Sequence, residues 1–219
     1  MHCFYVEPPE GGLANLPPDE AKHAARVLRL KPGDAVCAMD GAGGRWDARI
    51  AEVSGDAVRV ELLDRLPSNE APVRVTVYQG VPKADKLDFI VQKLTELGVS
   101  AVVPVKMARC VVRLDEKDGR KRRERLSRIA AEACKQCRRG NVPEIAEPLS
   151  WKQALARMAA HDLVLVPWEE ASGRRVKDAF AANPMARDIG IVIGSEGGMS
   201  EEEVAALVEA GAADRKSVV

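Results

Sequence analysis

Residues 1 to about 70 carry short apolar runs separated by clusters of glycine, aspartate and proline. Runs of this length, bounded by turn-forming residues, are typical of antiparallel strands joined by tight turns. The polar segment Pro67–Pro72 follows, and its composition marks a domain boundary. We therefore expect a small antiparallel β-domain over residues 1–70, with a helical stretch and three strands at Pro18–Leu30, Ala35–Met39, Trp46–Val53 and Ala57–Leu63.

From Val73 to Val219 the pattern changes to apolar runs that alternate with segments of helical period. This alternation predicts β-α units around a mostly parallel sheet, and hence an α/β domain over residues 73–219. The expected strands are Val73–Gln79, Val99–Val105, Leu163–Pro167 and Ile189–Ile193. The expected helices cover residues 85–97, 121–138, 151–160, 174–182 and 201–210. We expect the charged piece Asp115–Arg123 to be an exposed loop.

The predicted helix over residues 85–97 has a continuous apolar stripe. Its members recur every three or four positions, at Leu87, Ile90, Val91, Leu94 and Leu97. Residues with this spacing share one face of a helix. We interpret the stripe as a core-facing surface rather than a cofactor site.

Composition places the chain among globular proteins. Of its 219 residues 46% are hydrophobic, and the 33 basic side chains balance the 33 acidic ones, so the formal net charge is zero. The longest apolar runs fall far short of the ~20 residues that cross a bilayer, and no signal peptide is evident at Met1. We expect no membrane span and a cytoplasmic location.

The five cysteines are scattered and odd in number, which predicts reduced thiols rather than a disulfide framework. Only Cys134 and Cys137 have the spacing of metal ligands, and no second pair or nearby histidine completes a zinc site. We therefore expect no metal. None of the three histidines adjoins a nucleophile motif, which disfavours hydrolase chemistry.

Charge is unevenly distributed along the chain. Between Lys106 and Arg139 there are 13 basic and 5 acidic residues, a local net charge of +8. A second basic cluster, which includes Arg26 and Arg29, lies far away in the sequence. One charged run is usually the solvated face of a helix, but two such clusters on a small protein favour a polyanionic partner such as nucleic acid.

Candidate chemistry lies in the loops after the apolar strands, because ligands of an open parallel sheet bind at the carboxyl ends of its strands. Two loops are distinctive, Pro167-Trp168-Glu169 and Gly194-Ser195-Glu196-Gly197-Gly198. The glycines permit positive φ angles and close approach to a ligand, and Ser200 with Glu203 forms a capping box for the next helix. Neither P-loop nor G-x-G-x-x-G spacing is present, so a nucleoside without phosphates fits better than ATP or NAD.

Six motifs stand in a recognisable order: His23–Leu30, Val81–Asp88, Gln92–Val99, Arg128–Gln136, Val166–Glu169 and Ile193–Gly198. In this combination, over about 210 residues, the sequence resembles the ribosomal RNA small subunit methyltransferase E family. Members of that family belong to the SPOUT superfamily and use S-adenosyl-L-methionine to methylate N3 of a uridine.

The resemblance implies a PUA-like β-barrel RNA-binding domain followed by a SPOUT-type parallel sheet with a C-terminal trefoil knot. It also implies a homodimer that acts on ribosomal RNA or the small ribosomal subunit. The residues expected to hold S-adenosyl-L-methionine are Val166, Pro167, Trp168, Glu169, Ile193, Gly194, Glu196, Gly197 and Gly198. Those expected to contact RNA are Arg26, Arg29, Lys83, Arg109, Arg120, Arg122, Arg123 and Arg138.

The implied reaction is an in-line displacement in which a uracil nitrogen attacks the sulfonium methyl carbon. N3 of neutral uridine carries a proton, so the site must remove it and stabilise the resulting imide anion. A guanidinium near O2 or O4 would favour that anion, and we assign this role to Arg139, with water or an unidentified carboxylate as the base. Glu196 is expected to orient a loop or contact the cofactor rather than act as the base.

The sequence departs from the family pattern at three places. Ser195 stands where the family usually has proline, and Cys137-Arg138 where it has serine and glycine. The family continues beyond Gly211 with a strand, a Leu-Gly-x-Arg-Ile-Leu-Arg loop and a Thr-Glu-Thr-Ala helix, which are not found before Val219. These would supply a third cofactor loop, complete the knot and form part of the dimer interface.

Two alternative functions stay open: an RNA-binding protein without catalytic activity, and a SPOUT methyltransferase that modifies transfer RNA or a ribose 2′-hydroxyl.

Overall fold

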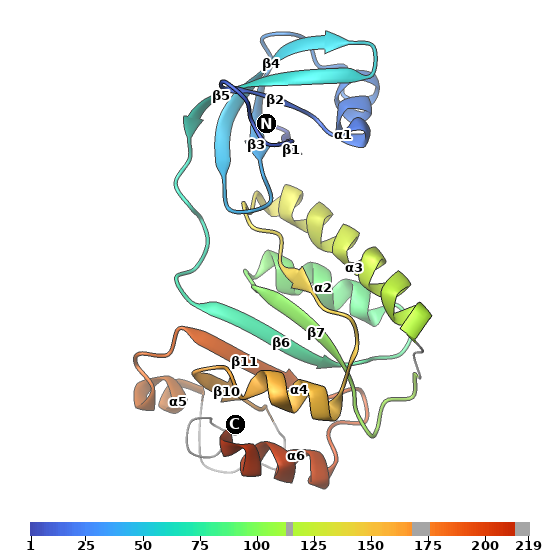
Figure 1. Cartoon of the computed structure of the whole chain (residues 1–219), viewed down its shortest axis with the longest axis vertical. Coiled ribbons are helices and arrows are strands. Elements are labelled where there is room, and N and C mark those ends of the chain that lie inside the picture. The colour runs from blue at the N-terminus through green and yellow to red at the C-terminus, as the bar shows by residue number, and fades with distance from the viewer. Residues whose placement is uncertain (113–115, 168–175, 213–219) are drawn as a thin grey trace. The chain divides into compact units, whose positions relative to one another are not determined.

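The structure is a computed structural model that describes residues 1–112, 116–167 and 176–212 (Figure 1). The chain forms two compact units. The first contains Met1–Glu70 together with Ala131–Val142, and the second contains Ala71–Ala130 together with Pro143–Val219. Each unit has its own sheet and its own apolar core.

The first unit is built on a curled five-stranded sheet in the order β1-β3-β4-β5-β2. Its strands are β1 Cys3–Tyr5, β2 Leu13–Asn15, β3 Ala35–Met39, β4 Arg45–Ser54 and β5 Ala57–Arg65. Two register shifts interrupt the β4–β5 ladder, and such irregularities increase strand twist and bend. The ladder between β1 and β3 is parallel, so the expectation of a wholly antiparallel domain is wrong at this one pair.

A short helix closes one side of this sheet. Helix α1 spans Pro18–Lys22 and continues as the π-helical turn η1, His23–Val27. Alternate residues of the strands, among them Phe4, Val36 and Ile50, point toward the helix and are buried with Ala21 and Ala24. This period of two is what a strand with one covered face requires.

The second unit contains a six-stranded sheet in the order β10-β11-β6-β7-β8, with β9 paired to β7, and every ladder in it is parallel. Its strands are β6 Arg74–Gly80, β7 Ala101–Lys106, β8 Glu144–Ile145, β9 Leu149–Ser150, β10 Leu163–Leu165 and β11 Asp188–Ile193. The prediction of an α/β domain with a parallel sheet is confirmed. Because the strands run in one direction, their carboxyl ends meet at one edge.

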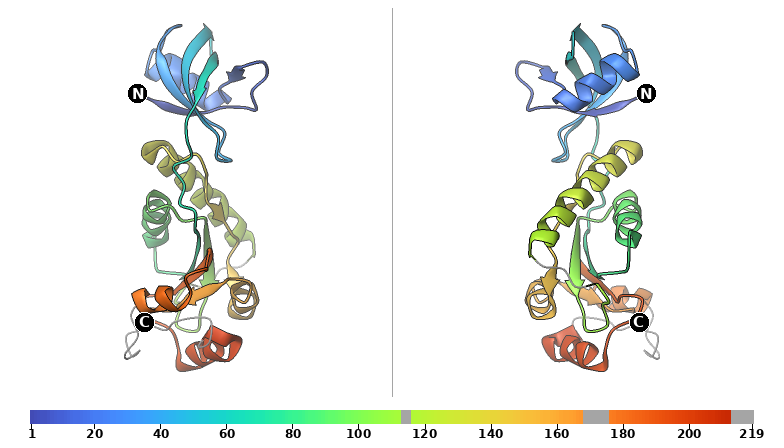
Figure 2. Two further views of the ribbon diagram at one scale, coloured as in Figure 1. Left: turned by 90° about the vertical axis from the view of Figure 1, so that its left-hand side faces the viewer. Right: turned by 90° about the vertical axis from the view of Figure 1, so that its right-hand side faces the viewer.

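Helices cover both faces of the parallel sheet. They are α2 Lys86–Glu96, α3 Glu116–Cys137, α4 Trp151–Met158, α5 Val176–Ala182 and α6 Glu201–Leu207, which continues as η2 Val208–Ala212. Figure 2 shows α2 and α4 on opposite sides of the sheet. In β10, Val164 packs in the core that includes α4 and α6, whereas Leu163 and Leu165 pack against α5. This alternation explains why the strand is apolar at every position.

Two expectations about the helices are wrong. Residues 116–123 are helical rather than looped, because α3 begins at Glu116, and lysine, arginine and glutamate favour helix without an apolar stripe. In α2, Leu87 and Val91 are buried as expected, but Leu97 is 83% exposed. The helix ends at Glu96, and Leu97 is its C-cap, so its side chain lies beyond the last packed turn.

Three polar side chains form a hydrogen-bonded network along β11, from Asp188 at its start to Tyr78 of β6. The hydroxyl of Tyr78 lies 2.8 Å from Nε2 of His161, whose Nδ1 lies 2.6 Å from Oδ1 of Asp188. Burial raises the pKa of Tyr78 to about 12, so the phenol stays neutral. The network satisfies groups that would otherwise be costly to bury.

Within the described ranges, no helix is long and apolar enough to span a bilayer.

Candidate active site

A cavity of about 430 Å³ lies where β11 ends, in the second unit. Its wall is the loop from Gly194 to Gly198, which connects β11 to α6. Further lining comes from Arg109 in the loop after β7, Pro167 after β10, Ile193 at the end of β11, Met199 just before α6 and Glu201 at the start of α6. The cavity therefore stands at the carboxyl ends of the strands, where the sequence predicts a ligand.

Glycine is required at three points of this wall. Gly198 has φ +71°, and its N–H donates to the carbonyl of Ser195 at 2.9 Å, which closes the corner. A Cβ at Gly194 would lie 2.9 Å from the carbonyl carbon of Gly198. A Cβ at Gly80, the last residue of β6, would lie 2.6 Å from the backbone nitrogen of Ser195. The expected tight corner is present, and its neighbour strand must also end in glycine.

Gln79 holds the corner against the sheet. Its Nε2 donates to the carbonyl of Gly194 at 3.1 Å and to that of Gly80 at 3.0 Å, and the residue is 5% exposed. The hydrophobic pattern does not single out Gln79 as a site residue. The available signal was a single amide at the end of the otherwise apolar run Val77-Tyr78-Gln79.

Glu203 joins α6 to the loop after β7. Together with Ser200 it forms the predicted capping box, and its Oε1 accepts from the backbone N–H of Ala108 at 2.7 Å. The neighbouring Arg109 then donates from Nη1 to the carbonyl of Gly197 at 3.1 Å. Arg109, predicted as an RNA contact, thus lies in the cavity wall with its guanidinium beside the glycine loop.

The carboxylate of Glu196 fixes the loop between β6 and α2. It accepts from the backbone N–H of Lys83 at 3.1 and 3.3 Å and pairs with the ammonium of Lys86 at 3.0 Å. The hydrogen bond from Lys86, followed by those from the backbone of Glu196 itself and of Lys83, lowers the pKa of the Glu196 carboxyl to about 2. A group so acidic and so engaged is a poor proton acceptor near neutral pH.

The second distinctive loop is described only in part. Val166 is fully buried and packs in the core, and Pro167 lines the cavity. Trp168 and Glu169, which were expected to bind cofactor, lie outside the described residues. The structure therefore brings together Pro167, Ile193 and the glycine loop as cavity residues.

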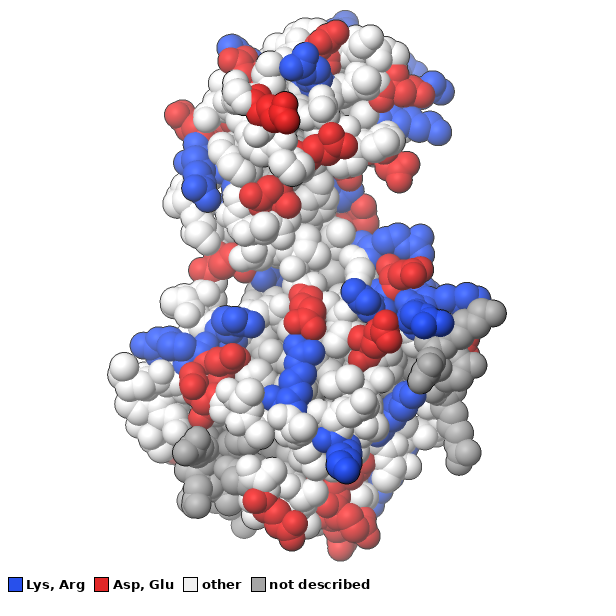
Figure 3. All heavy atoms as spheres, in the orientation of Figure 1, with Lys and Arg blue, Asp and Glu red and all other residues white. Residues whose placement is uncertain are grey.

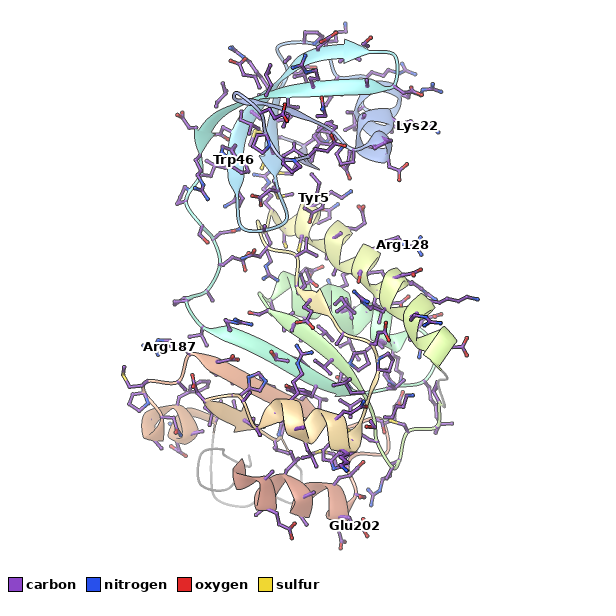
Figure 4. The ribbon with its side chains drawn as sticks, viewed as in Figure 1. Tyr5, Lys22, Trp46, Arg128, Arg187 and Glu202 are labelled. Atoms are coloured by element: carbon purple, nitrogen blue, oxygen red, sulfur yellow. The ribbon has the colours of Figure 1, made fainter. Side chains whose placement is uncertain are left out.

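Basic side chains gather over α3, interspersed with acidic ones (Figure 3). Arg120 is exposed, and Arg128 projects from the same helix (Figure 4). Two of the predicted RNA contacts have partial partners. Arg122 donates from Nη2 to the carbonyl of Ala84 at 3.5 Å, and Arg123 pairs with Glu147 at 3.6 Å.

Three non-glycine residues of the described chain have a positive φ, and each coincides with or adjoins a predicted RNA contact. They are Arg29 (φ +54°), Ala84 (φ +49°), which follows Lys83, and Arg138 (φ +58°). The left-handed conformation costs an L-residue roughly 1–2 kcal/mol. A cation at a helix C-terminus contributes only ~0.3–1 kcal/mol at an exposed site. Stability alone therefore does not explain an arginine at such a position.

The remaining predicted residues lie in the first unit. Arg26 forms a two-point pair with Asp56, at 2.6 and 2.7 Å, on the exposed surface. Arg139, proposed as the catalytic cation, is 5% exposed, and its guanidinium binds Glu70 at 2.6 Å from Nη2 and 3.2 Å from Nε. This pair identifies a structural contact of Arg139, and its catalytic role stays a prediction. No group of three or more His, Cys, Asp and Glu residues within the described part of the chain is arranged to hold a metal.

Both parts of the chain are similar to known protein families. The family described as RNA methyltransferase domain matches residues 69–215, and the RNA methyltransferase PUA domain matches residues 16–63. A Bacillus subtilis protein named ribosomal RNA small subunit methyltransferase E is 38% identical over 198 residues, which cover 87% of this chain and 77% of that protein. A protein of the same name from Mycobacterium tuberculosis is 34% identical over 217 residues, 95% of this chain and 81% of its own.

A solved structure shares the whole fold. The ribosomal RNA small subunit methyltransferase E of Neisseria gonorrhoeae, bound to S-adenosyl methionine, superposes with a TM-score of 0.85 at 29% identity, covering 100% of this chain and 88% of that one. The family resemblance read from the motifs is confirmed. With its PUA domain, its parallel sheet and its glycine corner, the chain belongs to the ribosomal RNA small subunit methyltransferase E family.

Proposed function

We propose that this protein transfers a methyl group from S-adenosyl-L-methionine to N3 of a uridine in small-subunit ribosomal RNA. The observation that carries the proposal is the glycine-walled cavity at the end of β11, in a fold shared with a relative that binds S-adenosyl methionine. Its volume of about 430 Å³ lies within the ~300–1,000 Å³ of small-molecule sites.

The residues present fit a nucleoside carrying a sulfonium. Gly194, Gly197 and Gly198 leave the backbone accessible where side chains would fill the space. Of the two carboxylates at the cavity, Glu196 is paired with Lys86, so Glu201 is the one that favours a cation over a phosphate. We assign cofactor binding to Pro167, to Ile193 and to the loop from Gly194 to Gly198, with Trp168 and Glu169 retained from the resemblance. When bound, the cofactor supplies an electrophilic methyl group.

Arg109 is the cation best placed to act on the acceptor base. Its guanidinium lies in the cavity wall and is held by the carbonyl of Gly197 and by the loop that Glu203 fixes. A guanidinium beside O2 or O4 of uracil favours the imide anion and so lowers the pKa of N3. Since Glu196 is engaged with Lys83 and Lys86, the proton passes to water or to a carboxylate outside that pair.

RNA binding is assigned to the first unit and to the arginines in the first turns of α3. We propose that residues 1–70 act as the RNA-binding domain and residues 73–219 as the catalytic domain. Arg26, Arg29, Lys83 and Arg138 are assigned to phosphate contacts together with Arg120, Arg122 and Arg123. We further propose that the protein acts in the cytoplasm as a homodimer, in keeping with a ribosomal substrate. Mapping the methylated nucleotide separates N3 of uridine from a transfer RNA or ribose 2′-hydroxyl target.

The first prediction concerns cofactor binding. In calorimetry with S-adenosylhomocysteine, the protein should bind, whereas Gly80→Ala should weaken binding by at least about tenfold, because its Cβ would displace the backbone of Ser195. Gly119→Ala, inside α3 and away from the cavity, is the matched control and should bind as the unchanged protein does. If the unchanged protein gave no binding heat at millimolar S-adenosylhomocysteine, an RNA-binding protein without catalytic activity would be favoured instead.

The second prediction compares two arginines. Arg109→Ala should lower the rate of single-turnover methyl transfer by about 100-fold at saturating cofactor. Because the pKa of N3 is then no longer lowered, the dependence of the rate on pH should shift to higher pH. Arg109→Lys should restore part of the rate. Arg139→Ala should mainly destabilise the fold, by about 3 kcal/mol, since it leaves the largely buried carboxylate of Glu70 without its cation. A folded Arg139→Ala variant that has lost methyl transfer would return the catalytic role to Arg139.

The third prediction concerns the Glu196 carboxyl. A folded-state pKa below the ordinary 4.5 means that its ion pair stabilises the protein above about pH 4.5 and that this contribution is lost as the pH falls toward 2. The melting-temperature difference between the unchanged protein and Glu196→Gln should therefore be largest above pH 4.5 and disappear near pH 2. Carbon NMR of the carboxyl gives the midpoint directly, and a midpoint near 4.5 would contradict the assigned contacts.

The fourth prediction concerns Arg120, Arg122 and Arg123 in the first turns of α3. RNA affinity should fall steeply with salt, and replacing Arg120, Arg122 and Arg123 together should flatten the log-log slope by about 2 if all three contact single-stranded phosphates. Fluorescence anisotropy over a salt series measures both slopes. Replacing Lys152, Lys177 and Arg187, which are exposed in the second unit and are not assigned to RNA, removes the same charge elsewhere and should leave the slope unchanged. Equal slopes for all three proteins would remove α3 from the RNA contact.

A further inference from the structure

We propose that a groove in the first unit, lined by His2, His23 and Arg138, binds one unpaired nucleotide of the RNA, with Arg138 on its phosphate and the imidazoles on its base. This inference rests on the proposed RNA substrate and adds a specific site to it. The groove lies entirely within the first unit, between β1, the helical turn around His23 and the last turn of α3. It is separate from the cavity at the end of β11, which belongs to the second unit.

The size and lining of the groove suit a single nucleotide. Its volume is about 270 Å³, just below the ~300–1,000 Å³ of small-molecule sites, so the groove holds no ligand larger than one nucleotide. Phe4 and Leu28 provide an apolar floor, and Phe4 is 2% exposed. The rim carries two exposed imidazoles, and stacking on aromatic or imidazole rings is how proteins hold unpaired RNA bases.

The ion pairs of the groove leave Arg138 available. The two acidic lining residues, Glu20 and Glu132, both pair with the ammonium of Lys135, at 2.7 and 2.5 Å. Arg138 is exposed, and its side chain makes a single contact with the described residues, from Nη2 to the carbonyl of Met1 at 3.5 Å. A guanidinium with open donor groups at a groove rim is suited to a phosphate.

The electrostatic environment of Cys3, which also lines the groove, supports an anionic ligand. The pKa of the Cys3 thiol is lowered to about 7, first by a hydrogen bond from the Cys37 thiol and further by the positive charges of Arg138 and Arg45. Burial opposes this shift and is its second-largest cause, so the thiol hydrogen bond dominates and the two guanidinium charges add to it. The positive charge of Arg138 therefore acts on the groove and favours a negative group there.

The backbone at Arg138 gives an independent reason to look for a ligand. Arg138 follows the last residue of α3, and the N–H of Arg139 donates to the carbonyl of Cys134 at 3.0 Å, a pattern that favours glycine at the residue between. An arginine here accepts a strained conformation, and strain of this kind concentrates at binding sites. The strain places the guanidinium at the groove rather than stabilising the helix end.

Glycine at position 138 should therefore stabilise the fold and weaken RNA binding at the same time. Arg138→Gly should raise the melting temperature by about 2–4 °C, because glycine adopts the left-handed conformation freely. The same variant should bind a fluorescein-labelled single-stranded oligouridylate about fivefold more weakly and flatten its log-log salt slope by about 0.7, the effect of one lost phosphate contact. Arg49→Gln, which removes an exposed charge from the same unit, should change neither quantity.

A second variant tests the base contact separately. His2→Ala with His23→Ala should weaken binding of the same oligonucleotide while leaving the salt slope unchanged, because stacking on a base releases no counterion from a phosphate. Unchanged affinity in both groove variants, with the parent protein binding RNA and methylating small ribosomal subunits, would overturn the groove and leave the proposed function intact. A parent protein that neither binds RNA nor transfers methyl groups would overturn the proposed function itself. A lower melting temperature for Arg138→Gly would refute the argument from strain.

Discussion

The close approach of two backbones at the end of the parallel sheet is the constraint on which the candidate site depends. Strand β6 ends at Gly80 directly beneath the corner between Gly194 and Ser195, at a separation that leaves no space for a Cβ. The amide of Gln79 then bridges the strand to the corner. Because protein interiors transmit small displacements rather than absorb them, the shape of the cavity is set by the sheet beneath it.

Much of the fold could be predicted from the sequence because the longer elements repeat their pattern several times. The helices α2, α4 and α6 and the strands β4, β5, β6 and β11 were expected close to their observed bounds. Strands β1, β2, β8 and β9 were missed, since two or three residues contain too few alternations to show a period. The start of α3 was missed for another reason: residues 116–123 are charged, and their helix comes from intrinsic propensity.

In the candidate site, local motifs could be predicted from the sequence, but contacts between distant residues could not. Ser200 and Glu203 were identified as a capping box from local spacing, which is a short-range property. The second contact of Glu203, with Ala108, joins residues 95 positions apart and requires the folded chain. For the same reason the sequence could assign Arg109 a positive charge but not its place beside the glycine loop. Arg139 was chosen for its charge, and only the fold shows that Glu70 binds it.

Helix α3 has a consequence for the modularity of the protein. One continuous helix contributes its first part to the second unit and residues 131–137 to the first. The latter residues and those that follow are bound to the N-terminal strands: Tyr5 donates to the carbonyl of Ala131 at 3.2 Å, and Gly43 to that of Gly140 at 3.1 Å. The β-domain is thus completed by residues synthesised some sixty positions after it ends, so it is not a self-contained cassette that evolution could have exchanged by a single insertion.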